Sequence, residues 1–108
     1  MKLEKHRFVV FKFYSENTIL KDNFIKGIWD SIYKIFGYKG ASETGLWIIE
    51  FDNVNKKGII RCSVKSLNYI KIALILTTYI PKDNPVMFQI VGVSGTIKKA
   101  KEKFYNEC

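Results

Sequence analysis

Four short runs of aromatic and β-branched residues are separated along this chain by segments with helical periodicity, and this order restricts the fold more than any other feature. Such residues favour strands, and turn-forming residues bound each run. The predicted strands span residues 7–14, 46–52, 59–63 and 86–93. The turn-rich segment 53–58 joins the middle two strands, so we expect these two to form a hairpin.

Apolar residues recur at helical spacing between the first two predicted strands. The repeat consists of Leu20, Phe24, Ile28, Ile32 and Ile35, with Trp29 and Phe36 beside it. Cap-type residues at 15–18 precede this segment. Gly37 and Gly40 are expected to end the helix that it forms.

A second predicted helix is apolar around nearly its whole circumference. It begins after Ser63 or Ser66, either of which can cap it, and runs to about Ile80. A helix of this kind needs cover on more than one side, so we expect a C-terminal helix, a partner protein, or both to lie over it. The candidate protein-interface residues are Tyr69, Ile72, Leu76 and Tyr79.

The order of elements is therefore strand, helix, strand, strand, helix, strand, helix. The first six match a ferredoxin-like β-α-β-β-α-β sandwich of the α+β class, with two helices on one face of a four-stranded antiparallel sheet. The helix after Ser94-Gly95-Thr96 is an addition. A length of 108 residues and an apolar fraction of 47% fit one domain over residues 1–108.

The chain carries an excess of positive charge. Eighteen Lys and Arg against ten Asp and Glu give a formal net charge of +8, which attracts polyanions such as nucleic acid. The charged N-terminus has no apolar segment of the signal-peptide type. The longest apolar run, 72–76, is far shorter than the ~20 residues of a spanning helix. We expect a cytoplasmic protein that binds nucleic acid and no membrane.

Residues capable of catalysis are sparse. Cys62 and Cys108 form no CxxC pair, which argues against a disulfide scaffold or a cysteine zinc site. His6 stands near the chain start, where a histidine is usually solvated. Glu50 and Asp52 share one face of a strand and could hold Mg²⁺, but no third ligand is evident, which favours a solvated strand end. We therefore expect no catalytic residue, metal or cofactor in this chain.

The third strand resembles an RNA-recognition motif only in part. The segment Lys57-Gly58-Ile59-Ile60-Arg61-Cys62-Ser63-Val64 has the Lys-Gly start of that motif but lacks its aromatic residues. Without them this strand cannot stack bases, so we expect the aromatic residues to lie in the core and any RNA to be bound through charge and shape.

The C-terminal helix is the best electrostatic candidate for RNA binding. Ile97, Ala100 and Phe104 form an apolar stripe that can dock on the domain, and lysines surround it. The preceding turn either receives a phosphate on free N–H groups or is an ordinary N-cap before a solvated lysine face. The candidate RNA-binding residues are Arg61, Ser94, Gly95, Thr96, Lys98, Lys99 and Lys101.

Over about residues 5–104 the chain resembles the protein component-two family of archaeal ribonuclease P, which is related to a eukaryotic subunit of the same enzyme. The segments that carry the resemblance are Arg7-Phe8, Ile28-Trp29-Asp30, Gly40-Ala41-Ser42, 46–52, 58–63, Ala73-Leu74 and Gly92-Val93-Ser94-Gly95-Thr96-Ile97-Lys98.

The resemblance implies a non-catalytic subunit of a ribonucleoprotein. In that family the RNA subunit is the catalyst that removes the 5′ leader from precursor tRNA, with Mg²⁺ expected for the RNA and no cofactor for the protein. The protein stabilises the catalytic RNA and pairs with a barrel-type subunit, component three, and such pairs can dimerise.

Two other functions are compatible with the same fold. One is a stand-alone or ribosome-associated RNA-binding module, which would bind RNA without a protein partner. The other is a small acylphosphatase-like hydrolase, which needs an arginine cradle in a phosphate loop. The chain has only Arg7 and Arg61 and no such loop after its first strand, which argues against the hydrolase.

Overall fold

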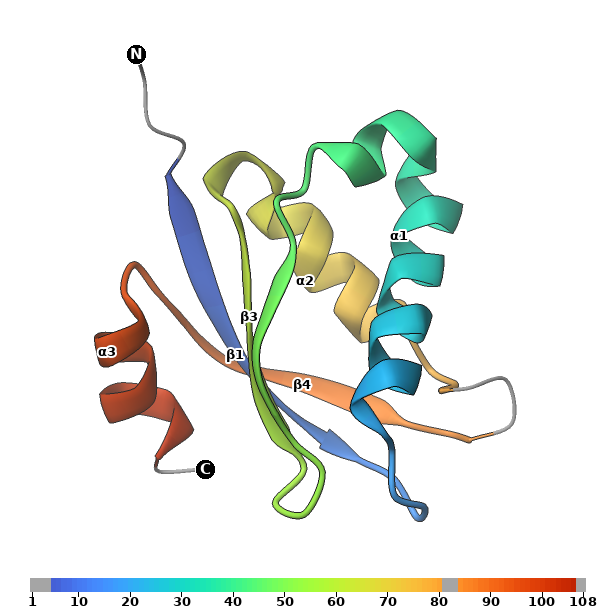
Figure 1. The fold of residues 1–108 in the computed structure, drawn as a ribbon, viewed down its shortest axis with the longest axis vertical. Coiled ribbons are helices and arrows are strands. Elements are labelled where there is room, and N and C mark those ends of the chain that lie inside the picture. The colour runs from blue at the N-terminus through green and yellow to red at the C-terminus, as the bar shows by residue number, and fades with distance from the viewer. Residues whose placement is uncertain (1–4, 81–83, 107–108) are drawn as a thin grey trace.

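A computed structural model describes residues 5–80 and 84–106, and its strands form one antiparallel sheet in the order β2-β3-β1-β4. The strands are β1 (His6–Tyr14), β2 (Trp47–Asp52), β3 (Lys57–Ser63) and β4 (Met87–Ser94). Helices α1 (Lys21–Ser42) and α2 (Leu67–Leu76) lie on one side of the sheet, and α3 (Ile97–Ala100) lies on the other (Figure 1). The predicted ferredoxin-like fold with an added C-terminal helix is confirmed.

The main core lies between the sheet and helices α1 and α2. Its centre is a group of phenylalanine rings from α1 and the sheet, in which Phe24 of α1 stacks on Phe51 of β2 with ring centroids 4.8 Å apart. Phe24 also lies 5.3 Å from Phe11 and 5.6 Å from Phe88. Fully burying such a side chain stabilises a fold by about 1.5–3 kcal/mol. The prediction that aromatic residues fill the core is confirmed for these rings.

Gly37 interrupts helix α1 as expected, but a second helical segment follows it and passes Gly40. The helix as a whole reaches Ser42, with a kink at Gly37, whose φ of 74° is a left-handed value that glycine adopts without strain. The expected apolar stripe is buried at its centre, but Leu20 and Ile35 at its two ends are exposed.

Helix α2 is shorter and differently capped than the sequence predicted. It ends at Leu76, and Thr77 has extended backbone angles, so the expectation that it reaches Ile80 is wrong. A short turn, Val64–Ser66, precedes it. The hydroxyls of Ser63 and Ser66 donate to the carbonyl of Glu43 and do not cap the helix. These serines therefore tie the start of α2 to the end of α1.

Helix α3 does not cover α2, as one sequence-based alternative had it, but packs on the opposite face of the sheet. It continues into a wider π-type turn at Lys101–Tyr105, and a second, small core forms from Val10, Ile59, Ala100 and Tyr105. The sheet side chains beneath α3 are apolar. Because only a short turn separates β4 from α3, the helix packs directly on them. Gly92 makes this approach possible, because a Cβ there would lie 2.4 Å from the ring of Phe104.

Candidate nucleic-acid interface

The turn that begins α3 is held by its own side chains. The Thr96 hydroxyl accepts the N–H of Lys99 at 3.1 Å, and the Ser94 hydroxyl accepts the N–H of Thr96 at 3.4 Å. Gly95 between them is exposed. The structure therefore shows an N-cap at this turn, with both hydroxyls used inside the chain.

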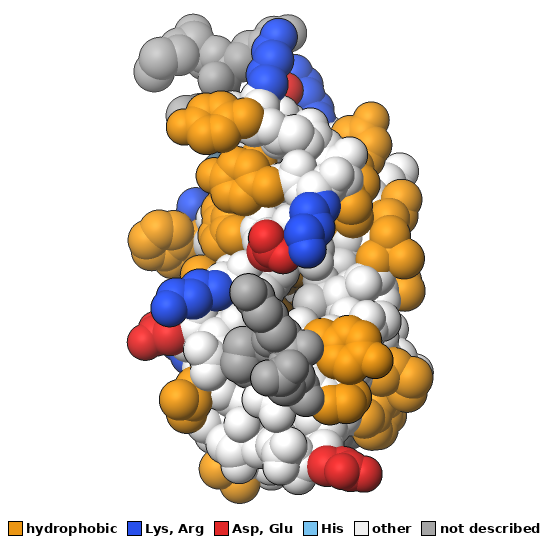
Figure 2. Space-filling model, turned by 90° about the vertical axis from the view of Figure 1, so that its right-hand side faces the viewer, with side chains coloured by type: hydrophobic (Ala, Val, Ile, Leu, Met, Phe, Trp, Pro, Cys, Tyr) orange, Lys and Arg blue, Asp and Glu red, His pale blue; other side chains and the backbone are white. Residues whose placement is uncertain are grey.

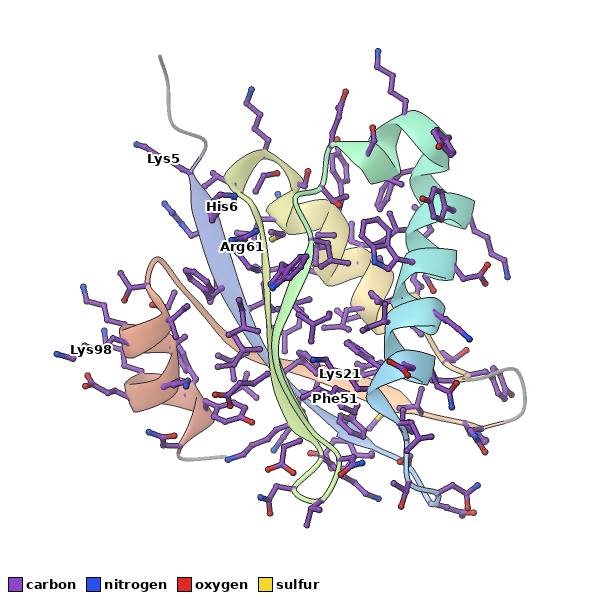
Figure 3. All side chains as sticks on the ribbon, viewed as in Figure 1. Lys5, His6, Lys21, Phe51, Arg61 and Lys98 are labelled. Atoms are coloured by element: carbon purple, nitrogen blue, oxygen red, sulfur yellow. The ribbon has the colours of Figure 1, made fainter. Side chains whose placement is uncertain are left out.

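The three candidate lysines that follow are not equivalent. Lys98 and Lys99 are exposed, and Lys98 points away from the sheet (Figure 3). Lys101 instead turns toward the sheet, where its Nζ lies 2.6 Å from the Glu50 carboxylate. That pairing offsets the charge of Lys101, so the accessible positive charge of the helix belongs mainly to Lys98 and Lys99.

The two carboxylates that could have held a metal are each engaged within the chain. The hydrogen bond from Lys101, with further bonding from Tyr105, holds the pKa of Glu50 below its ordinary 4.5. Asp52 accepts the N–H groups of Val54 and Asn55 at 2.9 and 3.0 Å, and hydrogen bonding to Asn55 lowers its pKa. Within residues 5–80 and 84–106 no group of three His, Cys, Asp or Glu side chains could hold a metal ion.

The remaining reactive side chains are placed in or beside the sheet. Cys62 is fully buried on the main-core side of β3, and burial raises the pKa of its thiol to about 11, so it is protonated at neutral pH. His6 is half-buried as the first residue of β1, not solvated at a frayed end as the sequence had suggested. Cys108 lies outside the described residues.

Arg61 lies apart from the lysines of α3 but on the same face of the sheet. Its neighbours on β3, Ile60 and Cys62, face the main core, whereas Arg61 pairs in register with Phe8 of β1 and Trp47 of β2. Figure 3 shows it near the end of the sheet where Lys5 and His6 lie, while Lys98 is on α3. The predicted RNA-binding residues therefore form two groups: Arg61, and the start of α3.

The outer face of α2 carries a second kind of surface. The four candidate protein-interface residues, Tyr69, Ile72, Leu76 and Tyr79, are each about half exposed, and Ile75, which the sequence analysis missed, is 55% exposed. Figure 2 shows hydrophobic side chains in several groups on the helical side of the molecule. A pocket of about 670 Å³ between α1 and the segment after α2 adjoins them, with Gly27, Ser31 and Leu76 in its wall.

Among the described residues, no helix is both long and apolar enough to cross a membrane.

Comparison with known proteins gives matches over most of the chain. The model of a family described as Rpp14/Pop5 matches residues 7–105. A Thermococcus gammatolerans protein named ribonuclease P protein component 2 is 36% identical over 104 residues, covering 96% of this chain and 86% of the relative. Proteins of the same name from Pyrococcus furiosus and Methanocaldococcus jannaschii are 35% and 34% identical, covering 96% and 94% of this chain and 86% and 73% of the relatives.

A solved structure shares the fold. A chain in the cryo-EM structure of yeast ribonuclease MRP superposes with a TM-score of 0.69, covering 100% of this chain and 97% of that one. At 14% sequence identity this likeness concerns the fold alone.

Proposed function

Because this chain belongs to the Rpp14/Pop5 family, we propose that it is a non-catalytic protein subunit of ribonuclease P, the ribonucleoprotein that removes the 5′ leader from precursor tRNA. The observation that carries the proposal is the match over residues 7–105, with relatives of the same name at about a third identity over nearly the whole chain. In this assignment the RNA subunit performs the hydrolysis with its own Mg²⁺, and the protein supports the structure of that RNA.

The face of the sheet that carries α3 is the proposed RNA-binding face. Lys98 and Lys99 are exposed there, and the capped turn of Ser94, Gly95 and Thr96 presents backbone beside them. Arg61 extends the positive charge along the sheet, and Lys101 contributes less because Glu50 offsets it. Lysine and arginine contacts to phosphate bind RNA without reading its sequence.

The helical face is the proposed protein-binding face. An exposed apolar surface on this face is formed by Tyr69, Ile72, Leu76 and Tyr79. In a monomer this surface would contact water and lower solubility. The barrel-type subunit of ribonuclease P is the proposed partner there, and dimerisation of such pairs can use the same face.

Removing the two exposed lysines of α3 tests the RNA-binding face. The double substitution Lys98→Ala and Lys99→Ala should weaken binding to ribonuclease P RNA and reduce the slope of log affinity against log salt by roughly one per lost contact. The measurement is a filter-binding titration over a range of salt concentrations.

The matched control removes two exposed lysines of α1, Lys21→Ala and Lys39→Ala, which leaves the same net charge. A salt slope that stays at the wild-type value in the α3 variant, or falls equally in both variants, would remove α3 from the RNA interface.

Placing charge on the helical face tests the protein interface. The double substitution Ile72→Glu and Leu76→Glu changes two half-exposed side chains, so the fold should persist while co-purification of the barrel-type subunit is lost. The same change on the exposed Val54 (Val54→Glu), in the β2–β3 turn, is the control. Undiminished recovery of the partner would show that it binds elsewhere.

A further inference from the structure

Helix α3 covers only part of its sheet face. The small core beneath it contains Val10 and Ile59, with Val91 and Ile49 packed against them. Two residues further along β1 and β3, and so on the same face, Phe8 lies opposite Arg61, and Arg61 lies opposite Trp47 of β2. Directly opposed residues of antiparallel strands share a face, so these three side chains form a strip across three strands. We call Phe8, Arg61 and Trp47 the uncovered strip.

Trp47 is exposed to an extent that packing within the chain does not explain. Its side chain is 63% accessible, whereas Phe8 at the other end of the strip is partly buried against the small core. A large aromatic ring held on a rigid strand loses little conformational entropy when a flat ligand stacks on it. The strip therefore offers a preformed platform at the position of Trp47.

Arg61 at the centre of the strip lacks a partner for part of its guanidinium. Its Nε is buried, and no hydrogen-bond acceptor for it exists among the described residues. A guanidinium stays charged at any ordinary pH, and a buried N–H without an acceptor costs free energy. An anionic or carbonyl acceptor bound beside Arg61 would satisfy the group after a small rotation of the side chain.

The surroundings of the strip favour an anionic ligand. The carbonyl of Lys5 accepts the N–H of Val64 at 3.0 Å, which joins the backbone of Lys5 to the Val64–Ser66 turn that contains the exposed Lys65. His6 lies two residues before Phe8 on β1 and therefore on the same face, and Figure 3 shows Lys5, His6 and Arg61 at one end of the sheet. Glu43 adjoins this end from the helical side, through its carbonyl contact with Ser63.

We infer that the uncovered strip binds one unpaired nucleotide of RNA, with its base stacked on the indole of Trp47 and its phosphate or base edge bonded by Arg61. This inference rests on the proposed function, which supplies RNA as the partner, and adds a single-stranded contact to the charge-based binding of α3. Stacking on an aromatic ring and bonding to arginine are the two interactions by which proteins hold unpaired bases.

Fluorescence of Trp47 gives a direct test. In the full chain with Trp29→Phe, the only tryptophan is Trp47, and a single-stranded oligouridylate should quench its emission at saturation. A duplex RNA of the same length should quench it far less, because its bases are already stacked. Absence of quenching by the single strand would overturn the inference.

Substitutions separate stacking from charge. Trp47→Ala should weaken single-strand binding roughly 5- to 150-fold while leaving the salt slope unchanged, and Trp47→Phe should restore most of the affinity. Arg61→Ala should reduce both affinity and salt slope, and Arg61→Lys should restore the slope but not the full affinity. The control is Tyr38→Ala, because this side chain is 82% exposed on α1, across the sheet from the strip.

The α3 variant distinguishes the failure of this inference from the failure of the proposed function. If Lys98→Ala with Lys99→Ala weakens RNA binding while Trp47→Ala binds as the wild type does, the strip is not a nucleotide site but the RNA-binding role stands. If both variants bind as the wild type does, the RNA-binding face itself is wrong. An equal loss of single-strand affinity in Tyr38→Ala and Trp47→Ala would show a nonspecific effect and would also overturn the inference that the strip binds a nucleotide.

Discussion

The two faces of the sheet are built in different ways. The face under α1 and α2 carries a continuous core of large side chains, with Phe11, Phe24 and Phe88 in mutual contact. The opposite face has a small core under one short helix, and beyond it Trp47 is largely exposed. The first arrangement stabilises the fold, whereas the second leaves aromatic and charged groups accessible for a ligand. The comparison teaches that the face that stabilises the fold is not the face on which we propose RNA binding.

The largest expected effect comes from opening the main core. Phe24→Ala removes a ring that contacts three other phenylalanines and should lower the free energy of unfolding by about 3–5 kcal/mol. That is a large share of the ~5–15 kcal/mol available to a typical domain. Urea denaturation followed by circular dichroism measures it. A loss below about 1 kcal/mol would contradict the assignment of stability to this face.

A smaller effect is expected where α3 approaches the sheet. Gly92→Ala brings a Cβ within 2.4 Å of the Phe104 ring, so α3 must shift, at a cost of about 1–3 kcal/mol. Hydrogen exchange should then quicken in α3 while α1 stays protected.

Gly95→Ala is the matched control for this prediction, because the nearest atom to a Cβ there is the Arg7 guanidinium at 3.9 Å. Adding Phe104→Leu to Gly92→Ala should recover part of the loss. Uniform loss of protection in both layers would show that the two faces do not behave as separate units.

The smallest effect is expected from the ion pair between Lys101, in the turn that continues α3, and Glu50 of β2. Glu50 and Lys101 are each more than a third exposed, so Glu50→Gln should cost about 0–1 kcal/mol at pH 7. Because the pKa of Glu50 is lowered in the fold, this contribution is present above its ordinary value of 4.5 and is lost as pH falls below it. The melting temperatures of the wild type and of Glu50→Gln should therefore converge as the pH is lowered from 7 to 3. A difference in melting temperature that grows toward low pH would contradict the pairing of Glu50 with Lys101.

The sequence was sufficient for the order of elements and the main core, because strand and helix periods are local signals. It did not place α3, since the apolar stripe of Ile97, Ala100 and Phe104 fits either layer equally well. The break at Gly37 was predicted, but the second helical segment that follows it to Ser42 was not. The lack of aromatic residues in the third strand says nothing about the neighbouring strand, where Trp47 is exposed.

The uncovered strip could not be found from sequence, because its members come from three strands. Phe8, Trp47 and Arg61 become neighbours only through the strand register, and register depends on long-range pairing. The accessible lysines pose a related problem, since only the contact with Glu50 distinguishes Lys101 from Lys98 and Lys99.

The measurement that tests the central claim most directly is purification of the tagged chain from its native cell, with sequencing of the bound RNA and an assay of precursor-tRNA cleavage. The account predicts one structured RNA, a barrel-type protein partner and removal of the 5′ leader by the purified complex. It also predicts less bound RNA when Lys98 and Lys99 are both replaced by Ala. Recovery of ribosomes or mixed RNA without cleavage would contradict the account and indicate a stand-alone RNA-binding module.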